Sequence, residues 1–223
     1  MKQALKKLFF KDQNTDYLFS RGILKGLKFR TNPMHKMQRI VGLDEREIEA
    51  ITRAYSTQSA SAIDVGANDG WYTLFFASQP SIKQIIACEP EEQYTADFNH
   101  NFIINPAVDK NKVKVVQAFV GTGKGEKFVQ IDELTIDLQE PILLKIDVDG
   151  AEVDVLKSAE YTLNNKKTLL IMETHSPQLE RDCVKHLSER GYRVTIVKNA
   201  WYRLFIKDLR PLEQNRWLFA AKY

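Results

Sequence analysis

The sequence predicts an α/β fold built on an open, mostly parallel sheet, and its alternating pattern carries that prediction. From residue 60 onward, short apolar runs alternate with stretches of helical period. The runs are nearly continuous in apolar residues, as is typical of strands covered by helices on both faces. Such an alternation favours parallel strands joined by right-handed crossovers. The predicted strands are residues 62–65, 84–88, 113–120, 142–148, 168–174 and 192–197.

The segments between these runs repeat apolar residues three or four positions apart, which predicts helices packed on the sheet. Ser176 and Pro177 are typical of an N-cap followed by proline at the first helical position, and Gly191 marks the end of that helix. The three clearest stripes are Tyr94, Phe98 and Phe102; Leu156, Ala159 and Leu163; and Leu179, Cys183 and Leu187.

The two ends of the chain depart from the alternation. Residues 216–223 are strand-like and follow residues 192–197 through a polar connector, so we expect an antiparallel hairpin at the edge of the sheet. Residues 43–55 have helical period, and Asp44 with Glu47 has the form of a capping box. We expect one or two short strands or a loop over residues 24–33.

Positive charge is concentrated at the start of the chain. Residues 1–40 contain ten Lys or Arg and two Asp, a net charge of +8, whereas the whole chain carries +3. Such an arm favours peripheral contact with an anionic surface, and a solvated tail is the alternative. We therefore divide the chain into a basic N-terminal extension, residues 1–42, and a main domain, residues 43–223.

Composition favours a globular protein of the cytoplasm. The chain is 43% hydrophobic and 27% charged, and no apolar run approaches the roughly 20 residues that span a bilayer. The apolar run near the start is only Leu8 to Phe10, too short for the core of a signal peptide. The two cysteines, Cys88 and Cys183, form no close-spaced pair, and we expect both to be reduced and buried.

A glycine-containing corner follows the first predicted strand, in the run SAIDVGANDGWYTL. Ligands of open α/β sheets bind beyond the carboxyl ends of the strands, and glycine permits tight turning and close approach of a ligand. A purely structural turn is the alternative. The polar and small residues that we expect to contact a cofactor here are Asp64, Gly66, Ala67, Asn68, Asp69 and Gly70.

The second predicted strand ends in an acid, Glu89, followed by Pro90. An acid in this position accepts hydrogen bonds from the hydroxyls of a ribose, although a helix N-terminus also favours an acid. The first corner carries two carboxylates, Asp64 and Asp69, which disfavour a pyrophosphate and suit a cationic amino-acid group. Together these features point to S-adenosylmethionine rather than to a dinucleotide.

Five motifs, in this order and spacing, resemble the FkbM family of S-adenosylmethionine-dependent O-methyltransferases. They are AIDVGANDGWYTLFFA (62–77), ACEP (87–90), NFIIN (101–105), KIDVDGAEVDVLKSA (145–159) and IMETH (171–175). The resemblance covers roughly residues 60–175. The family more often has Glu where this chain has Asp149, which leaves the charge unchanged.

The resemblance implies a class I methyltransferase fold over residues 43–223, Rossmann-like, with seven strands and the C-terminal strand antiparallel. It implies methyl transfer to a hydroxyl of a carbohydrate or secondary metabolite. It also implies that the residues after the third strand, Gln117 and Ala118, lie near the adenine of the cofactor, in addition to the contacts from the first two strand ends.

Methylation of a hydroxyl needs a base, and polar residues end the next two predicted strands. Asp147, with Lys145 two residues earlier on the same face, follows the fourth strand, and we expect it to contact the cofactor as well as the hydroxyl. Glu173 and His175 follow the fifth strand. The alternatives are a buried Asp147 paired with Lys145, an anchoring role for Glu173 and a substrate-side His175.

A divalent metal is a weaker alternative for the same residues. Asp147, Asp149, Glu173 and His175 offer suitable ligands, but no spacing signature supports a metal, and we predict none. Glu152 falls in the first turn of a helix, where an acid is favourable in any case.

The sequence is also compatible with two other functions: methylation of an amine or carboxylate, and cofactor binding without catalysis. The chain has no N/D-P-P-aromatic element, so we expect no nucleic-acid partner. The sequence does not specify an oligomeric state.

Overall fold

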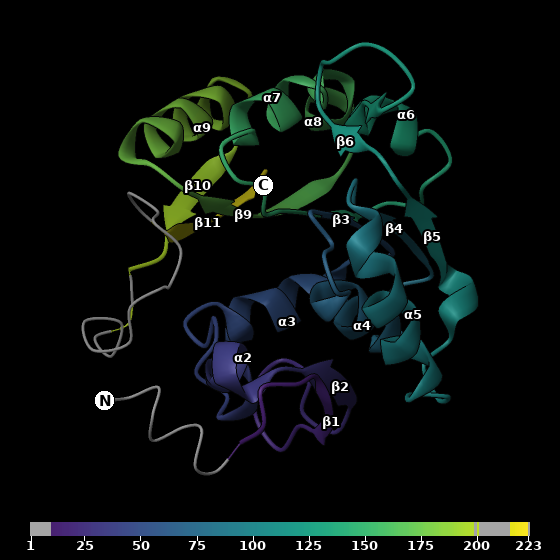
Figure 1. Cartoon of the computed structure of the whole chain (residues 1–223). Helices are drawn as coiled ribbons and strands as arrows, with labels where there is room; N and C mark the ends of the chain where they lie inside the picture. Colours follow the sequence, from purple (N-terminus) through teal and green to yellow (C-terminus); the bar gives the residue numbers. More distant parts are fainter. Residues whose placement is uncertain (1–9, 199, 201–214, 223) are drawn as a thin grey trace.

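The computed structural model describes residues 10–198, 200 and 215–222 (Figure 1). A seven-stranded sheet has the order β10-β11-β9-β8-β3-β4-β5. Strands β3, β4, β5, β8 and β9 are mutually parallel, whereas β11 is antiparallel to both β9 and β10. This confirms the predicted α/β sheet with its antiparallel C-terminal strand. The strands are β3 Ser61–Val65, β4 Gln84–Cys88, β5 Val113–Val116, β8 Ile142–Ile146, β9 Thr168–Thr174, β10 Arg193–Ile196 and β11 Arg216–Ala221.

Helices cover both faces of the sheet, as the continuous apolar runs predict (Figure 1). One face carries α6 Ile131–Leu134, α7 Glu152–Lys157, α8 Glu160–Asn165 and α9 Pro177–Glu189. The other carries α2 Pro33–Ile40, α3 Glu49–Gln58, α4 Trp71–Ser78 and α5 Thr95–Ile103. Because strand side chains alternate, Leu143 packs in one hydrophobic cluster and Leu144 in the other. Two short 3-10 helices, Glu92–Tyr94 and Lys110–Lys112, lie in the connections.

Residues 10–42, which are most of the predicted extension, pack on the face of the sheet that bears α4 and α5. Strands β1 Thr15–Leu18 and β2 Lys28–Thr31 form an antiparallel hairpin. The backbone of β2 bonds to side chains of α5: the Arg30 amide donates to Asn101 at 2.8 Å. Phe19 and Phe29 lie edge-on to Trp71, at 5.2 and 4.9 Å between ring centroids. The division at residue 42 stays a prediction from charge. The first nine residues of the basic arm lie outside the described residues.

The predicted strand over residues 113–120 is wrong in its second half. Strand β5 ends at Val116, and the chain leaves the sheet at Gln117. Phe119–Val120 forms β6, which pairs with β7, Phe128–Val129, in a separate two-stranded sheet. The reason is that β4, the only strand that pairs with β5 in the described sheet, ends at Cys88, which is paired with Val116.

The predicted capping box is also wrong. Helix α3 begins at Glu49, its N-cap is Ile48, and no side chain caps it. The carboxylate of Asp44 pairs instead with Arg39, at 3.3 Å. Glu45 adopts a left-handed backbone conformation with φ of 50°, which excludes it from a helix.

The helix predicted around Leu156, Ala159 and Leu163 is split into α7 and α8, although all three side chains are buried in one cluster. The predicted N-cap of α9 is confirmed, because the Leu179 amide donates to Ser176 Oγ at 3.1 Å. Gly191 follows that helix with φ of 80°.

The two cysteines, Cys88 and Cys183, are buried free thiols, as predicted. Among the described residues, no helix has both the length and the apolar character needed to cross a membrane.

Candidate active site

The candidate active site lies where the parallel strands β3, β4, β8 and β9 end. Val65 pairs in register with both Cys88 and Ile146, and Ile146 pairs with Met172. The residues that follow these positions therefore meet at one edge of the sheet. In this way the fold brings together residues that lie up to 111 positions apart in the sequence, from Asp64 to His175.

A buried ion pair joins the first strand to the fourth. Lys145 Nζ lies 3.0 Å from Asp64 Oδ1, and the two side chains are 2% and 0% exposed. Thr73 Oγ1 donates to the other oxygen of Asp64 at 2.7 Å. Burial alone would lower the pKa of Lys145, but the Asp64 carboxylate outweighs it and raises that pKa. Asp64 is thus engaged within the protein, and its predicted contact with a cofactor stays a prediction.

The glycine corner, residues 66–70, is shaped by contacts of the chain with itself. Gly66 has φ of 76°, and a Cβ there would lie 2.0 Å from the carbonyl oxygen of Asp147. Gly70 has φ of 85°, and a Cβ would lie 2.8 Å from the ring of Phe98. Both positions therefore require glycine for structural reasons. Close approach of a ligand to this backbone remains a separate prediction.

Glu89 is held beside the glycine corner by two backbone groups. The amides of Asn68 and Glu91 each donate to one of its carboxylate oxygens at 2.9 Å. Burial raises the pKa of Glu89, and these two hydrogen bonds oppose that shift. Each carboxylate oxygen has a second lone pair, so the fixed carboxylate still has capacity to accept a hydroxyl.

The remaining predicted cofactor residues lie near this carboxylate along the same edge. Ala67 is buried, Pro90 is half-buried, Gln117 is exposed and Ala118 is buried. Gln117 and Ala118 directly follow β5, the neighbour of β4.

Arg39 is a site residue that the sequence reasoning missed. Its Nη1 lies 2.7 Å from Asp69 Oδ2 in the glycine corner, and its Nε lies 3.3 Å from Asp44. The guanidinium stacks over Trp71, 4.7 Å from the ring centroid. In the sequence, Arg39 is only one of the ten positive charges of residues 1–40. A cation already faces each of the two corner carboxylates, so their charges no longer favour S-adenosylmethionine over a dinucleotide.

A second group of side chains forms the carboxylate–histidine cluster: Asp147, Asp149, Glu152, Glu173 and His175. His175 Nδ1 lies 2.5 Å from Glu152 Oε1. On its other side, Nε2 lies 3.3 Å from Glu173, 3.4 Å from Asp149 and 3.9 Å from Asp147. The side chains of Glu152, Glu173 and His175 are 0–4% exposed, that of Asp147 is 20% exposed and that of Asp149 is 70% exposed.

Three of the predicted catalytic residues, Asp147, Glu173 and His175, are thus in mutual contact, and the fourth, Lys145, lies 3.6 Å from Asp147. Glu152 is an addition to this set. Glu152, which the sequence gives only as a first-turn acid, fixes the orientation of His175. Helix α7 begins at Glu152, directly after the loop that carries Asp147. No motif distinguishes this role from an ordinary acid at a helix start.

Burial and the neighbouring charges raise the pKa values of Glu173 and His175. Burial raises the pKa of Glu173 well above its ordinary value, and the neighbouring Asp147 raises it further. Burial lowers the pKa of His175, but the neighbouring carboxylates of Glu152 and Glu173 outweigh that effect and raise it to about 10. Both shifts favour the protonated forms of these two side chains.

Tyr72 and Glu45 lie beside the same buried lysine. The Tyr72 hydroxyl donates to Glu45, and Lys145 Nζ lies 5.1 Å from the centroid of the Tyr72 ring. Burial, together with the charges of Asp44 and Asp147, raises the pKa of Glu45 to about 7.

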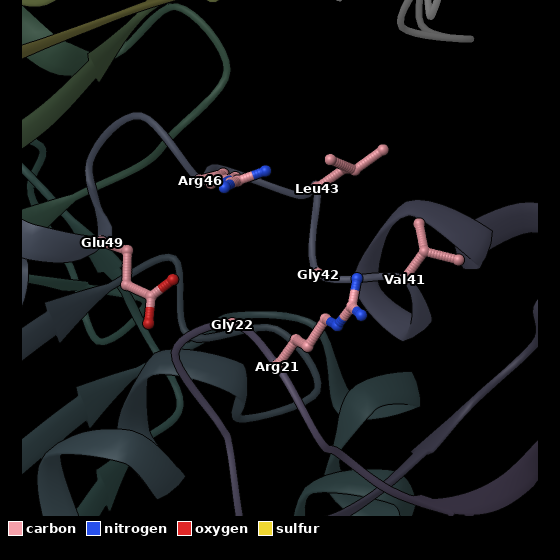
Figure 2. Close-up of a pocket in the computed structure, with 7 residues that line it drawn as sticks. All are labelled: Arg21, Gly22, Val41, Gly42, Leu43, Arg46 and Glu49. Atoms are coloured by element: carbon pink, nitrogen blue, oxygen red, sulfur yellow. The ribbon is translucent and has the colours of Figure 1, made fainter.

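A pocket of about 300 Å³ lies elsewhere, in the N-terminal part of the molecule (Figure 2). None of the predicted cofactor or catalytic residues lines it. Its lining residues are Arg21, Gly22, Val41, Gly42, Leu43, Arg46 and Glu49.

Comparison with known proteins shows which proteins this chain resembles. Residues 126–194 match the family model of the methyltransferase FkbM domain. No curated protein matches the chain. Among solved structures, methyltransferase FkbM from Methylobacillus flagellatus KT is 16% identical, with a TM-score of 0.59. The alignment covers 74% of this chain and 44% of that one, so this chain spans less than half the length of that protein.

Two other solved structures share the fold over nearly their whole length. Precorrin-6y C5,15-methyltransferase from Geobacter metallireducens GS-15 is 16% identical with a TM-score of 0.54, covering 84% of this chain and 94% of that chain. SMU.1697c, a putative methyltransferase from Streptococcus mutans in complex with SAH, is 12% identical with a TM-score of 0.54, covering 80% and 98%.

These identities are low, and they show the fold alone. The seven-stranded class I methyltransferase fold and the domain match over residues 126–194 agree with the five motifs. The resemblance to FkbM methyltransferases that those motifs predict is confirmed over residues 126–194, and the fold is that of class I methyltransferases.

Proposed function

We propose that the protein transfers a methyl group from S-adenosylmethionine to a hydroxyl of a small molecule or glycan. One observation carries the proposal: Asp147, the most accessible of the three contacting groups Asp147, Glu173 and His175, lies between Lys145 and the other two. Its carboxylate is 3.6 Å from Lys145 Nζ and 3.9 Å from His175 Nε2. A carboxylate at the edge of a parallel sheet, beside the glycine corner, is suitably placed to receive a hydroxyl proton.

Among the residues present, Glu89 fits the cofactor best, at the ribose. Glu89 is fixed by two backbone amides and retains acceptor capacity, which suits the two hydroxyls of a ribose. Gln117 and Ala118 would lie beside the adenine on the neighbouring strand end. When bound, S-adenosylmethionine supplies the electrophilic methyl group. The protein's task is to align the acceptor and to take its proton, and alignment alone contributes several kcal/mol.

Accessibility assigns the base, and the pKa shifts agree with it. Glu173 and His175 are buried and their pKa values are raised, which favours their protonated forms, whereas Asp147 is 20% exposed. Asp147 is therefore the proposed base. It takes the hydroxyl proton while the acceptor oxygen forms its bond to the methyl carbon and the carbon–sulfur bond breaks. Lys145 supplies a positive charge beside Asp147, and His175 would contact the acceptor.

A screen with labelled S-adenosylmethionine against glycans, metabolite extracts, tRNA and rRNA tests this proposal. Nucleic acids belong in it because chains described as a putative tRNA methyltransferase and an rRNA methylase share the fold, with TM-scores of 0.51 and 0.52. Label in an alkali-stable ether of a small molecule or glycan is the expected product. Label only in an amine, a carboxylate or RNA would contradict hydroxyl methylation, and cofactor binding without any turnover would favour a non-catalytic role.

Once an acceptor is found, two variants separate the base from the positioning residues. Asp147→Asn conserves volume and removes the proton acceptor, so kcat should fall by roughly 10²–10⁴-fold with cofactor affinity little changed. His175→Ala should mainly raise the KM for the acceptor. Asp137→Asn, at an exposed position before β8, is the matched control. A dead His175→Ala beside an active Asp147→Asn would make His175 the base.

Two further expectations remain proposals. The positive charge of residues 1–40 supports contact with an anionic surface, which deletion of residues 1–15 should weaken, most clearly at low salt. Location in the cytoplasm rests on the sequence alone.

A further inference from the structure

The carboxylate–histidine cluster has the ligand atoms of a cation site, although the spacing of these residues in the sequence predicts no metal. Asp147, Glu173 and His175 each present one possible ligand atom, and these three atoms lie within 4.8 Å of one another. They come from the ends of two neighbouring strands, β8 and β9, and the register of Ile146 with Met172 brings them side by side. Two carboxylates and an imidazole are a ligand set typical of divalent metal ions.

His175 supplies an independent observation that points to a ligand. Its side chain is 4% exposed, and within the described part of the chain its Nε2 forms no hydrogen bond. That nitrogen faces Glu173 Oε2 at 3.3 Å and Asp149 Oδ1 at 3.4 Å. A buried, unsatisfied nitrogen directed at carboxylates is costly unless something lies between them.

The other nitrogen of the ring is held as a metal-binding histidine requires. Nδ1 lies 2.5 Å from Glu152 Oε1, and Glu152 is fully buried. When a cation displaces the proton from Nε2, the proton that stays on Nδ1 is donated to this carboxylate and the lone pair of Nε2 is directed into the cluster. Histidines that ligate metals almost always donate their second ring N–H in this way, which fixes the ring and strengthens the ligand.

We propose that Asp147, Glu173 and His175 bind one divalent cation, with Glu152 as the positioning residue for His175. The mixed oxygen and nitrogen ligands favour Mn²⁺ over Mg²⁺. Three protein ligands leave coordination positions open on the side of Asp147, whose side chain is 20% exposed. On the proposed function, an acceptor hydroxyl would occupy one of these positions and be made more acidic by the ion.

Titration of the full-length protein with Mn²⁺, after removal of metals by a chelator, tests the site without any acceptor or cofactor. Calorimetry should show one Mn²⁺ per chain. His175→Gln should weaken binding at least 100-fold, and Glu152→Gln should weaken it by 10–100-fold because the ring loses its orienting partner. His186→Gln, a histidine beside Glu160 and outside the cluster, is the matched control and should bind as the wild type does.

Pulsed electron paramagnetic resonance of the Mn²⁺-loaded wild type gives a second test that requires no variant to fold. Coupling to the ¹⁴N of one imidazole is expected. Absence of that coupling, absence of Mn²⁺ binding up to 1 mM, or unchanged binding by His175→Gln would overturn the site. In that event, protons shared between the carboxylates and the imidazole hold the cluster together without a cation. Because no methyl transfer is measured, failure of this site and failure of the proposed reaction are distinguishable.

Discussion

Lys145 Nζ lies 3.0 Å from Asp64 Oδ1, and both side chains are inaccessible to solvent. Lys145 also donates to the carbonyl oxygen of Gly66 at 3.1 Å. The lysine therefore joins the end of β8 to the end of β3 at the level of the glycine corner. The sequence predicts that the carboxylate of Asp64 attracts a cationic ligand. In the fold its charge is balanced internally, and the pair is part of the scaffold of the site.

Lys145→Met should destabilise the protein severely, because it leaves the Asp64 carboxylate buried without a cation. Loss of one partner of a buried pair typically costs 3–5 kcal/mol. We expect a loss of about that size in the free energy of unfolding measured with urea. The double variant Asp64→Asn, Lys145→Met removes both charges and should recover much of the loss. A single variant as stable as the wild type would contradict the pairing.

Replacement of Glu89 tests the ribose site without knowledge of the acceptor. Glu89→Ala removes up to two charge-assisted hydrogen bonds, each worth roughly 1.5–3 kcal/mol, and should weaken binding of S-adenosylhomocysteine at least tenfold by calorimetry. Glu92→Gln, an exposed acid nearby, is the matched control. Unchanged affinity in Glu89→Ala would place the ribose elsewhere.

The same carboxylate gives a pH dependence. Its folded pKa is raised above the ordinary value of 4.5, chiefly by burial. The ionised form accepts the hydroxyls, so affinity for S-adenosylhomocysteine should fall as the pH drops through that raised pKa. Glu89→Gln should lose this dependence. An equal acid limb in both proteins would assign it to another group.

Arg39 connects the N-terminal segment to the glycine corner, so its loss should affect both stability and cofactor affinity. Arg39→Gln leaves Asp69 and Asp44 without their cation, at a cost of about 1–3 kcal/mol in unfolding free energy. S-adenosylhomocysteine should bind roughly 3–10-fold more weakly, because one charge-assisted hydrogen bond no longer fixes the corner. Arg30→Gln, which breaks a half-exposed pair with Asp16 in the same segment, should change neither by more than a small factor.

Local patterns in the sequence predict the sheet and the glycine corner well. The strands of the buried sheet are read from continuous apolar runs, and the Ser176 cap from a two-residue rule, because both depend on neighbouring residues alone. The prediction for strand β5 is too long, because the apolar run continues to Val120 whereas the strand ends at Val116. The capping box fails because Asp44 has a better partner, Arg39, in a separate helix.

The contacts within the site could not be predicted in the same way. Arg39 lies 30 positions before Asp69, and Glu152 lies 23 positions before His175. Neither spacing has a periodic or motif meaning, since the pairs are made by the packing of separate elements. Sequence reasoning named the groups at the strand ends, but it could not say which charge each would face.

Glu45 provides a test of the buried charges through protein stability. Its pKa is raised to about 7 in the folded protein, chiefly by burial and then by the charge of Asp44, against 4.5 ordinarily. A raised pKa means that the folded protein retains a proton that the unfolded chain releases. The stability from this group is therefore complete below pH 4.5, is lost as the pH rises to about 7, and is constant above.

The free energy of unfolding attributable to Glu45 should thus fall with pH between about 4.5 and 7, with a slope of at most about 1.4 kcal/mol per pH unit. Glu45→Gln keeps a hydrogen-bond acceptor for the Tyr72 hydroxyl but cannot ionise, so the fall should be smaller in that variant. Urea unfolding at several pH values, compared between wild type and variant, isolates the contribution. Glu133→Gln, at an exposed position of α6, controls for the general loss of one charge. Parallel stability curves for wild type and Glu45→Gln would show that Glu45 titrates as an ordinary surface acid, and that the Tyr72 contact leaves its proton unaffected.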